Sequence, residues 1–211
     1  MLYMALPKGR IMEESLPLLK SIGIIIEEEF YSKTTRKLEF STNIENLKIV
    51  VVRAFDICKF VENDAVDIAI CGLDVLEEFC SPSICKVKDL QIGKCRLSFA
   101  KKESHVIKGS VLNIATKYVN ITSQYLKNTG FEANIIKLNG AIECAANLGL
   151  CDIICDLVSS GRTLKENNMI EEKQILDVSS YLAVSKTSLR LKNKELNELL
   201  TLFSKDISLQ Q

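Results

Sequence analysis

Short apolar runs recur along this chain and alternate with amphipathic or charged stretches. The runs have the length and the alternation of β-strands, while the stretches between them have the spacing of amphipathic helices. The strand-like runs are residues 2–6, 47–52, 67–72, 95–101, 111–117, 133–138, 152–158 and 181–185. This alternation predicts an α/β protein.

Glycine and proline mark the expected helices. Gly23, Gly130 and Gly149 follow helical patterns at positions where a left-handed residue ends a helix. Pro17 lies inside the pattern IMEESLPLLKSIG, so we expect it to kink that helix or to restrict it to the segment after Pro17. The chain contains no low-complexity linker, which disfavours separate domains on a flexible tether.

The last helical pattern, KNKELNELLTLFSKDI, carries one apolar stripe. Leu196, Leu199, Leu200 and Phe203 recur in it at helical spacing. The stripe indicates either a helix that docks on the protein's own core or a face for a partner helix. Docking on its own core is the simpler interpretation.

Composition and charge exclude several classes of function. The 211 residues are 47% hydrophobic, which is enough for a substantial core. Lys plus Arg and Asp plus Glu both number 27, so the formal charge is zero and nothing in it favours nucleic acid or an anionic membrane as a partner. We find no signal-peptide pattern and no membrane-spanning apolar stretch, so we expect a cytoplasmic protein in which any anion site is local.

The cysteines do not form a recognisable metal or disulfide pattern. The chain has eight cysteines, a single histidine, His105, and no C-x-x-C pair. We therefore expect free thiols in a reduced compartment and no metal site held by the protein. His105 has charged neighbours, and we expect it in a surface loop.

The densest group of candidate functional residues lies in the segment CDIICDLVSSGRTLKEN, residues 151–167. Alternation along the strand places Asp152 and Asp156 on one face, about 13 Å apart. The strand is followed by a short turn of small and polar residues and then by the helix-forming residues LKEN. A turn between the carboxyl end of a strand and the start of a helix presents backbone N–H groups that bind phosphate.

Each residue type in this turn suits the binding of a sugar phosphate. Gly161 lets the backbone approach an anion, the hydroxyls of Ser159, Ser160 and Thr163 donate hydrogen bonds, and Arg162 offsets charge. The two aspartates before the turn can accept hydrogen bonds from sugar hydroxyls. An ordinary capped strand–helix turn is the alternative that turn composition alone leaves open.

Residues 143–164, ECAANLGLCDIICDLVSSGRTL, resemble the phosphoribosyl pyrophosphate signature of one enzyme family, the short form of ATP phosphoribosyltransferase. The resemblance runs through nearly the whole chain. Supporting matches are ALPKGR at 5–10, VVRAFDI at 51–57, DIAICGLDVL at 67–76, GKCRLSFA at 93–100, ATKYVNIT at 115–122 and IIKLNG at 135–140.

The resemblance implies a reaction and a fold. ATP and phosphoribosyl pyrophosphate would combine at adenine N1 and release pyrophosphate, which is the first step of histidine biosynthesis. The implied fold is a two-lobed α/β arrangement like that of type II periplasmic binding proteins, with the active site in the cleft between the lobes. We expect one lobe at 1–90 plus 183–211, the other at 91–182, and no C-terminal regulatory domain.

The resemblance also implies the roles of individual residues. Basic side chains would face the two polyanionic substrates, and Arg53 and Arg36 would stabilise pyrophosphate. Glu143 would belong to the ribose site. Mg²⁺ would be carried by the substrate phosphates, and we assign it no protein ligand. Our candidates are Arg53 and Arg36 for catalysis, and Lys8, Gly9, Arg10, Gly72 and Asp74 for ATP binding.

Short-form members work with a separate regulatory subunit that resembles histidyl-tRNA synthetase, so we expect a homodimer within such a hetero-oligomer. Two other functions stay open at this point. The same fold hosts non-catalytic sensors and solute-binding modules, and a phosphate turn also occurs in enzymes that transfer phosphoribosyl groups to other bases.

Overall fold

The computed structural model describes residues 1–103 and 111–205 and divides the chain into two compact units. The first unit comprises residues 1–76, 80–93 and 179–211, and the second comprises 77–79 and 94–178. The main boundaries therefore fall at 93/94 and 178/179, whereas the sequence placed them at 90/91 and 182/183. His105 lies outside the described residues.

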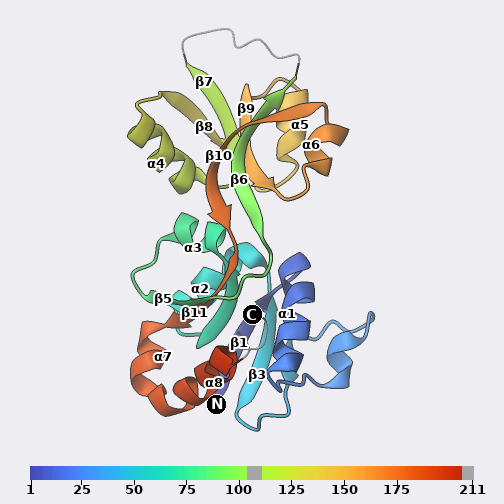
Figure 1. Cartoon of the computed structure of the whole chain (residues 1–211), viewed down its shortest axis with the longest axis vertical. Helices are drawn as coiled ribbons and strands as arrows, with labels where there is room; N and C mark the ends of the chain where they lie inside the picture. The colour runs from blue at the N-terminus through green and yellow to red at the C-terminus, as the bar shows by residue number, and fades with distance from the viewer. Residues whose placement is uncertain (104–110, 206–211) are drawn as a thin grey trace. The chain divides into compact units, whose positions relative to one another are not determined.

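A six-stranded mixed sheet forms the centre of the first unit, in the order β2-β3-β1-β4-β11-β5 (Figure 1). The three inner parallel strands are β1 (Leu2–Pro7), β3 (Leu47–Val52) and β4 (Ile68–Gly72). Strands β2 (Glu39–Ser41) and β11 (Ser180–Ser185) run antiparallel to them, and β5 (Ile84–Asp89) pairs antiparallel with β11. Pro7 pairs with Val52, so β1 and β3 end side by side.

Helices from both ends of the chain cover this sheet. They are α1 (Arg10–Ser21), α2 (Ile57–Glu62), α3 (Leu73–Phe79), α7 (Lys186–Leu191) and α8 (Asn193–Lys205), with short 3-10 turns η1 (Glu28–Tyr31) and η2 (Ala54–Asp56). Leu196, Leu199 and Phe203 of α8 are buried in the same core cluster as Leu19 of α1. The apolar stripe of α8 therefore docks on the protein's own core, as the simpler interpretation predicted.

The helix ends were predicted better than the effect of proline. Gly23, Gly130 and Gly149 have φ values of 82°, 72° and 76°, which confirms left-handed residues at these positions. Pro17 does not restrict the helix to the segment after it, because α1 begins at Arg10 and continues through Pro17 to Ser21. The other alternative, a kink at Pro17, stays a prediction.

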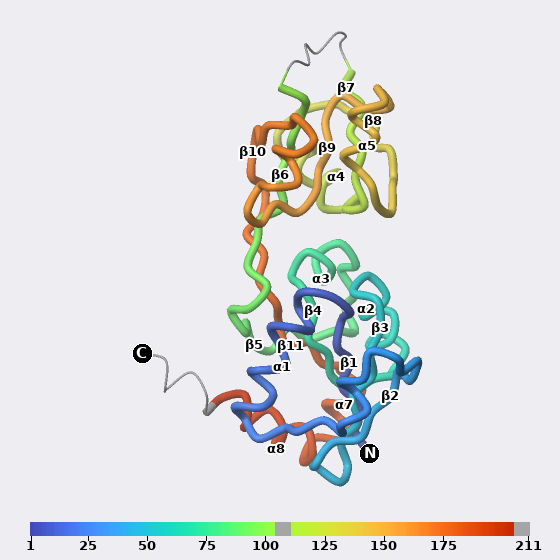
Figure 2. The backbone as a smooth tube through the Cα atoms, turned by 90° about the vertical axis from the view of Figure 1, so that its right-hand side faces the viewer, coloured from blue at the N-terminus to red at the C-terminus, as the bar shows by residue number. Residues whose placement is uncertain are grey.

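The second unit contains a five-stranded sheet in the order β10-β6-β9-β7-β8. Its strands are β6 (Cys95–Lys102), β7 (Leu112–Thr116), β8 (Ala133–Lys137), β9 (Ile153–Val158) and β10 (Met169–Val178). Strands β7, β8 and β9 are parallel, while β6 runs antiparallel to β9 and β10. Figure 2 follows β6 and β10 side by side along their length.

Three helices flank this second sheet. They are α4 (Val119–Thr129), α5 (Ile142–Asn147) and α6 (Arg162–Glu166). Figure 1 shows α4 on one side of the sheet and α5 and α6 on the other. Ile142, Ala145 and Leu164 from α5 and α6 share a buried cluster with Ile154 and Val158 of β9. This packing fixes the segment that joins β9 to α6.

All eight strand-like runs of the sequence are strands, which confirms the predicted α/β class. The structure adds β2, β5 and β10, and each lies at an edge of its sheet. Within residues 1–103 and 111–205, no helix combines the length and the apolar character that a membrane crossing requires.

A buried carboxylate ties the start of the chain to the segment before α8. Asp67 is 2% exposed, and its side chain accepts hydrogen bonds from Tyr3 N at 2.9 Å, Ser188 Oγ at 2.6 Å and Lys192 Nζ at 2.8 Å. A buried charge needs such partners, because an unpaired charge in the interior is costly. Asp67 therefore holds β1, α7 and the segment leading into α8 together.

We expect Asp67→Ala to lower the free energy of unfolding by about 3 kcal/mol, because it leaves the three donors without their buried acceptor. Urea unfolding followed by circular dichroism measures this change. Glu39→Gln is the control, since Glu39 pairs with Lys48 on an exposed edge, and its unfolding midpoint should stay unchanged. An unchanged midpoint for Asp67→Ala would contradict this account of the network.

Candidate functional site

The turn after β9 has the geometry of an anion-binding segment. Strand β9 ends at Val158, and Gly161 at the start of α6 has φ 74° and ψ 4°. This left-handed conformation favours glycine, although the space around an added Cβ is open. Among the described residues, the amides of Ser160 and Gly161 donate no hydrogen bond. These two amides can therefore donate to a ligand.

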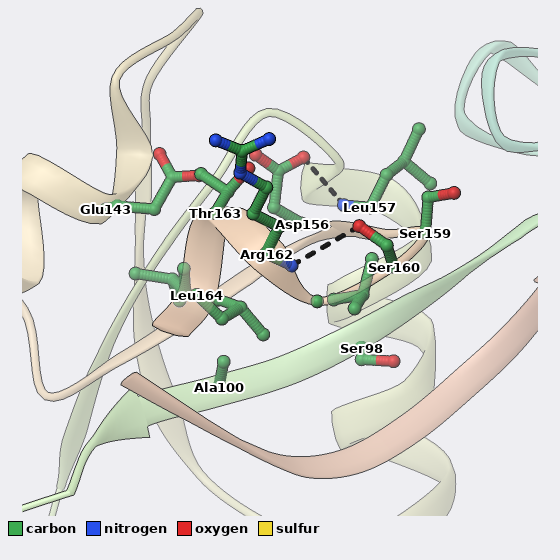
Figure 3. Close-up of a pocket in the computed structure, with 13 residues that line it drawn as sticks. Ser98, Ala100, Glu143, Asp156, Leu157, Ser159, Ser160, Arg162, Thr163 and Leu164 are labelled. Carbon is green, nitrogen blue, oxygen red and sulfur yellow. Dashed lines mark hydrogen bonds between the residues drawn. The ribbon is translucent and has the colours of Figure 1, made fainter. Parts of the chain in front are cut away.

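A cavity of about 140 Å³ opens at this turn. Figure 3 shows its lining side chains, with Glu143 approaching from α5. The lining consists of Ser98, Ala100, Glu143, Ile154, Asp156 and residues 157–164. Seven of the eight residues predicted to bind the sugar donor are in this lining, and they come from β9, α5, α6 and the turn.

The eighth residue, Asp152, lies elsewhere. It precedes β9, and its Oδ2 accepts a hydrogen bond of 2.8 Å from the backbone N of Asn113. The amide of Asp152 in turn donates to the Asn113 carbonyl at 2.9 Å. Asp152 thus joins the start of β9 to β7, at the other end of the strand from the turn.

Asp156 and Glu143 supply the carboxylates of the cavity. Asp156 Oδ1 accepts a hydrogen bond from the amide of Leu157 at 2.8 Å and lies 3.6 Å from Lys117 Nζ. Glu143 is half-buried in the first turn of α5. Both side chains offer acceptors of the kind that bind sugar hydroxyls.

Lys117 was not among the residues predicted to form the site. It follows β7 directly, and the pairing of Thr116 with Cys155 places it beside Asp156. The motif ATKYVNIT contains this lysine, so the signal was present, but its meaning depends on which strands are neighbours.

Arg162 contributes its backbone amide to the turn, while its charge is paired with Glu166. Its amide donates to Ser160 Oγ at 3.4 Å, while its guanidinium pairs with Glu166 at 2.7 Å and its side chain is 83% exposed. The charge of Arg162 is therefore already partnered in this structure.

Cys155 is next to Asp156 in sequence but does not offer a reactive thiolate. Burial raises the pKa of the Cys155 thiol to about 12. The thiol therefore stays neutral near pH 7, and nucleophilic cysteine chemistry is not expected at this site.

In the first unit, several predicted residues lie at the carboxyl ends of the parallel strands. Lys8, Arg53 and Leu73 follow the parallel strands β1, β3 and β4. The amide of Lys8 donates to the Val52 carbonyl at 2.9 Å, so Lys8 and Arg53 leave adjacent strands at the same level. Ligands in α/β sheets bind at such carboxyl ends.

Lys8 and Arg36 line one cavity of about 450 Å³, whose apolar wall includes Met12, Phe30 and Phe40. Arg53 is exposed but lies outside this lining. The structure therefore places Lys8 and Arg36 in the lining of one cavity. It also places Lys8 and Arg53 side by side along the sheet, at the carboxyl ends of β1 and β3.

The remaining predicted residues shape the backbone around these strand ends. Gly9 has φ 98° at the start of α1, and the Arg10 guanidinium donates to the Gly93 carbonyl at 3.0 Å. A side chain at position 72 would collide with the carboxylate of Asp74, which is 4% exposed. Gly72 and Asp74 are thus packed tightly against each other where β4 passes into α3.

Metal-binding side chains do not cluster in the part of the chain that the structure describes. Within these residues, no group of three or more His, Cys, Asp or Glu side chains could hold a metal ion. The eight cysteines carry free thiols.

Comparison with known proteins identifies the family. The sequence model of ATP phosphoribosyltransferase matches residues 53–205. An ATP phosphoribosyltransferase of Novosphingobium aromaticivorans is 45% identical over 207 residues, which cover 96% of this chain and 93% of that protein. The structure is similar to the ATP phosphoribosyl transferase (HisG:HisZ) complex from Thermotoga maritima, with a TM-score of 0.83, 30% identity and coverage of 99% of each chain.

More distant structural similarity confirms the fold class. The periplasmic aliphatic sulphonate binding protein SsuA of Escherichia coli aligns with a TM-score of 0.58 at 14% identity, covering 97% of this chain and 71% of that one. The α/β fold is therefore that of type II periplasmic binding proteins. The chain belongs to the ATP phosphoribosyltransferase family and catalyses the first step of histidine biosynthesis, in which ATP and phosphoribosyl pyrophosphate are joined.

Proposed function

We propose that the turn after β9 binds the 5′-phosphate of phosphoribosyl pyrophosphate. The observation that carries this proposal is the left-handed Gly161 in a turn whose Ser160 and Gly161 amides can donate to a ligand. The hydroxyls of Ser159, Ser160 and Thr163 add donors around the same cavity.

The ribose is assigned to the carboxylates beside the turn. Glu143 and Asp156 accept hydrogen bonds from the sugar hydroxyls, and Lys117 holds the Asp156 carboxylate in place. Asp152 has no part in this proposal, because its carboxylate is bound to Asn113.

Arg53 and Arg36 are assigned to the pyrophosphate. Departure of pyrophosphate leaves positive charge on the sugar and negative charge on the leaving group, so catalysis rests on stabilising the departing charge. Arg53 acts on the leaving pyrophosphate, and the shared cavity of Lys8 and Arg36 gathers cationic groups for phosphates.

We assign ATP to the carboxyl ends of the parallel strands in the first sheet, where Lys8, Gly9, Gly72 and Asp74 lie. Gly9 allows close approach of the backbone, and the tight packing of Gly72 on Asp74 gives the β4–α3 junction a fixed shape. Arg10 supports this region through its hydrogen bond to Gly93.

The attack itself needs no protein base. Adenine N1 is a ring nitrogen whose lone pair is free near pH 7, so general base catalysis is not required. Holding the reactants in line and stabilising charge are then the main contributions of the protein.

Magnesium is assigned to the substrate phosphates. The cavity at the turn offers two carboxylates, and that of Asp156 already faces Lys117 and the Leu157 amide. Mg²⁺ keeps several of its waters and is usually bound by one or two carboxylates together with substrate phosphate oxygens, so this set of donors suits an ion that the substrate carries. When bound, the ion would neutralise part of the pyrophosphate charge.

A separate regulatory subunit is the proposed partner. The Thermotoga maritima structure with 99% mutual coverage is a HisG:HisZ complex, which supports a hetero-oligomer for this chain as well. A homodimer of this chain within that assembly and a cytoplasmic location stay predictions.

One assay tests the proposed reaction. The protein is incubated with labelled ATP, phosphoribosyl pyrophosphate and Mg²⁺, with and without a candidate regulatory subunit, and the adduct and pyrophosphate are measured. We expect both products in equal amounts. No adduct under either condition would favour a non-catalytic sensor, which is the other function that this fold supports.

We expect Gly161→Asp to weaken the binding of phosphoribosyl pyrophosphate by at least about 100-fold, because it places a carboxylate against the phosphate. Gly161→Ala is the matched control, since it has the same left-handed strain without the charge. Titration calorimetry measures the affinity, and thermal unfolding checks that both variants are folded. Wild-type affinity in folded Gly161→Asp would refute this placement of the phosphate.

We expect Arg53→Ala to lower kcat about 100-fold, because it removes a cation that stabilises the leaving pyrophosphate. The Kd for ATP should change by less than about threefold. Steady-state kinetics and direct binding measure the two quantities, and Lys59→Ala on the exposed face of α2 is the control. A change confined to ATP affinity would instead give Arg53 a binding role.

A further inference from the structure

The guanidinium of Arg96 connects the turn after β9 to the edge strand β10. Its Nη1 donates to the carbonyl oxygen of Ser159 at 3.1 Å, and its Nε and Nη2 donate to the two carboxylate oxygens of Glu171 at 2.6 and 2.5 Å. Ser98 Oγ donates to the same carboxylate at 2.7 Å. Glu171 thus anchors the arginine, and the arginine holds one peptide of the turn.

The strand register places Arg96 on the cavity's side of the sheet. Arg96 pairs with Val158 and Ser98 pairs with Asp156, so the side chains of Arg96 and Ser98 project on the same face of β6. Ser98, Asp156 and Val158 line the cavity, whereas Arg96 stands outside the lining at the end of this row, beside the turn.

We propose that Arg96 is a positioning residue for the donor's 5′-phosphate, because its hold on the Ser159 carbonyl sets the direction of the Ser160 amide. The peptide group is planar and trans, so the Ser159 carbonyl and the Ser160 N–H point to opposite sides. With the carbonyl bound to Arg96, the amide points away from it and is held ready for the anion. This inference rests on the proposed binding of phosphate by the turn.

The charges around Arg96 indicate support of the backbone rather than direct contact with phosphate. The Arg96 guanidinium lowers the pKa of the Glu171 carboxyl, so the carboxylate stays ionised beside it. The pair is therefore close to neutral. Its contribution comes from geometry, since one planar guanidinium can bind both carboxylate oxygens and a carbonyl at once.

Lysine cannot reproduce this arrangement. A Lys side chain can keep an ion pair with Glu171, but its single ammonium has no fork that reaches both the carboxylate and the Ser159 carbonyl. Arg96→Lys therefore keeps an ion pair between β6 and β10 but removes the hydrogen bond to the Ser159 carbonyl.

The second unit also offers a matched control. Lys101 and Glu172 form another ion pair between β6 and β10, with Nζ 3.0 Å from Oε1. Both residues line a cavity that does not include the turn. Lys101→Met removes a cross-strand ion pair and leaves the turn untouched.

The test measures binding of ribose 5-phosphate to the full chain by calorimetry at constant ionic strength. We expect a Kd about tenfold higher for Arg96→Lys and about threefold higher for Glu171→Gln, which loosens the arginine. Lys101→Met should bind like the wild type. The amide resonance of Ser160 should shift less on addition of ribose 5-phosphate in Arg96→Lys than in the wild type, while thermal unfolding shows that each variant is folded.

Three results would overturn the proposal. Unchanged affinity in folded Arg96→Lys would show that the hold on Ser159 is not needed for binding. Tighter binding in Glu171→Gln would show that Arg96 acts through its charge on the ligand, because that change frees the charge. Lack of binding by both the wild type and Lys101→Met would instead reject the phosphate site itself, and with it the proposed function of the turn.

Discussion

The direction of the parallel strands determines which residues of this protein lie together at the carboxyl ends of its two sheets. The carboxyl ends of β1, β3 and β4 lie on one side of the first sheet, and those of β7, β8 and β9 lie on one side of the second. Residues that follow these strands leave the sheet together, although they are far apart in sequence. Lys8 and Arg53 leave adjacent strands in this way in the first unit, and in the second unit Lys117 lies beside Asp156 of β9.

The central strands and the edge strand β8 could be predicted from the sequence, whereas the other three edge strands could not. A central strand is covered on both faces and paired on both sides, so it appears as an apolar run. Strand β10 pairs with only one neighbour, contains two register shifts, and has polar exposed positions such as Lys173 and Gln174. Its sequence, MIEEKQILDV, therefore lacks a clear run, and β2 and β5 have the same edge position.

The lining of the cavity was predictable where its residues are neighbours in sequence. The turn combines a glycine, hydroxyls and an aspartate within a few residues, and these do line one cavity. Arg96, Lys117 and the partner of Asp152 depend on register instead. Asp152 resembles Asp156 in type and strand position, but its partner Asn113 is 39 residues away, and only the pairing of β7 with β9 brings them together.

The cations near the turn after β9 and those at the predicted phosphate positions of the first unit differ in how they are partnered. Near the turn, Arg96, Lys117 and Arg162 each face a carboxylate, those of Glu171, Asp156 and Glu166. In the first unit, Lys8, Arg36 and Arg53 have no ion pair among the described residues.

This difference agrees with the roles proposed for the two sets of residues. The 5′-phosphate keeps its charge throughout the reaction, so amides and hydroxyls in a nearly neutral site can hold it equally in the ground state and the transition state. The pyrophosphate gains charge as it departs, and unpaired cations stabilise it most at that stage. A chain with zero formal charge can therefore catalyse a reaction between two polyanions, because what matters is which cations lack partners and not how many there are.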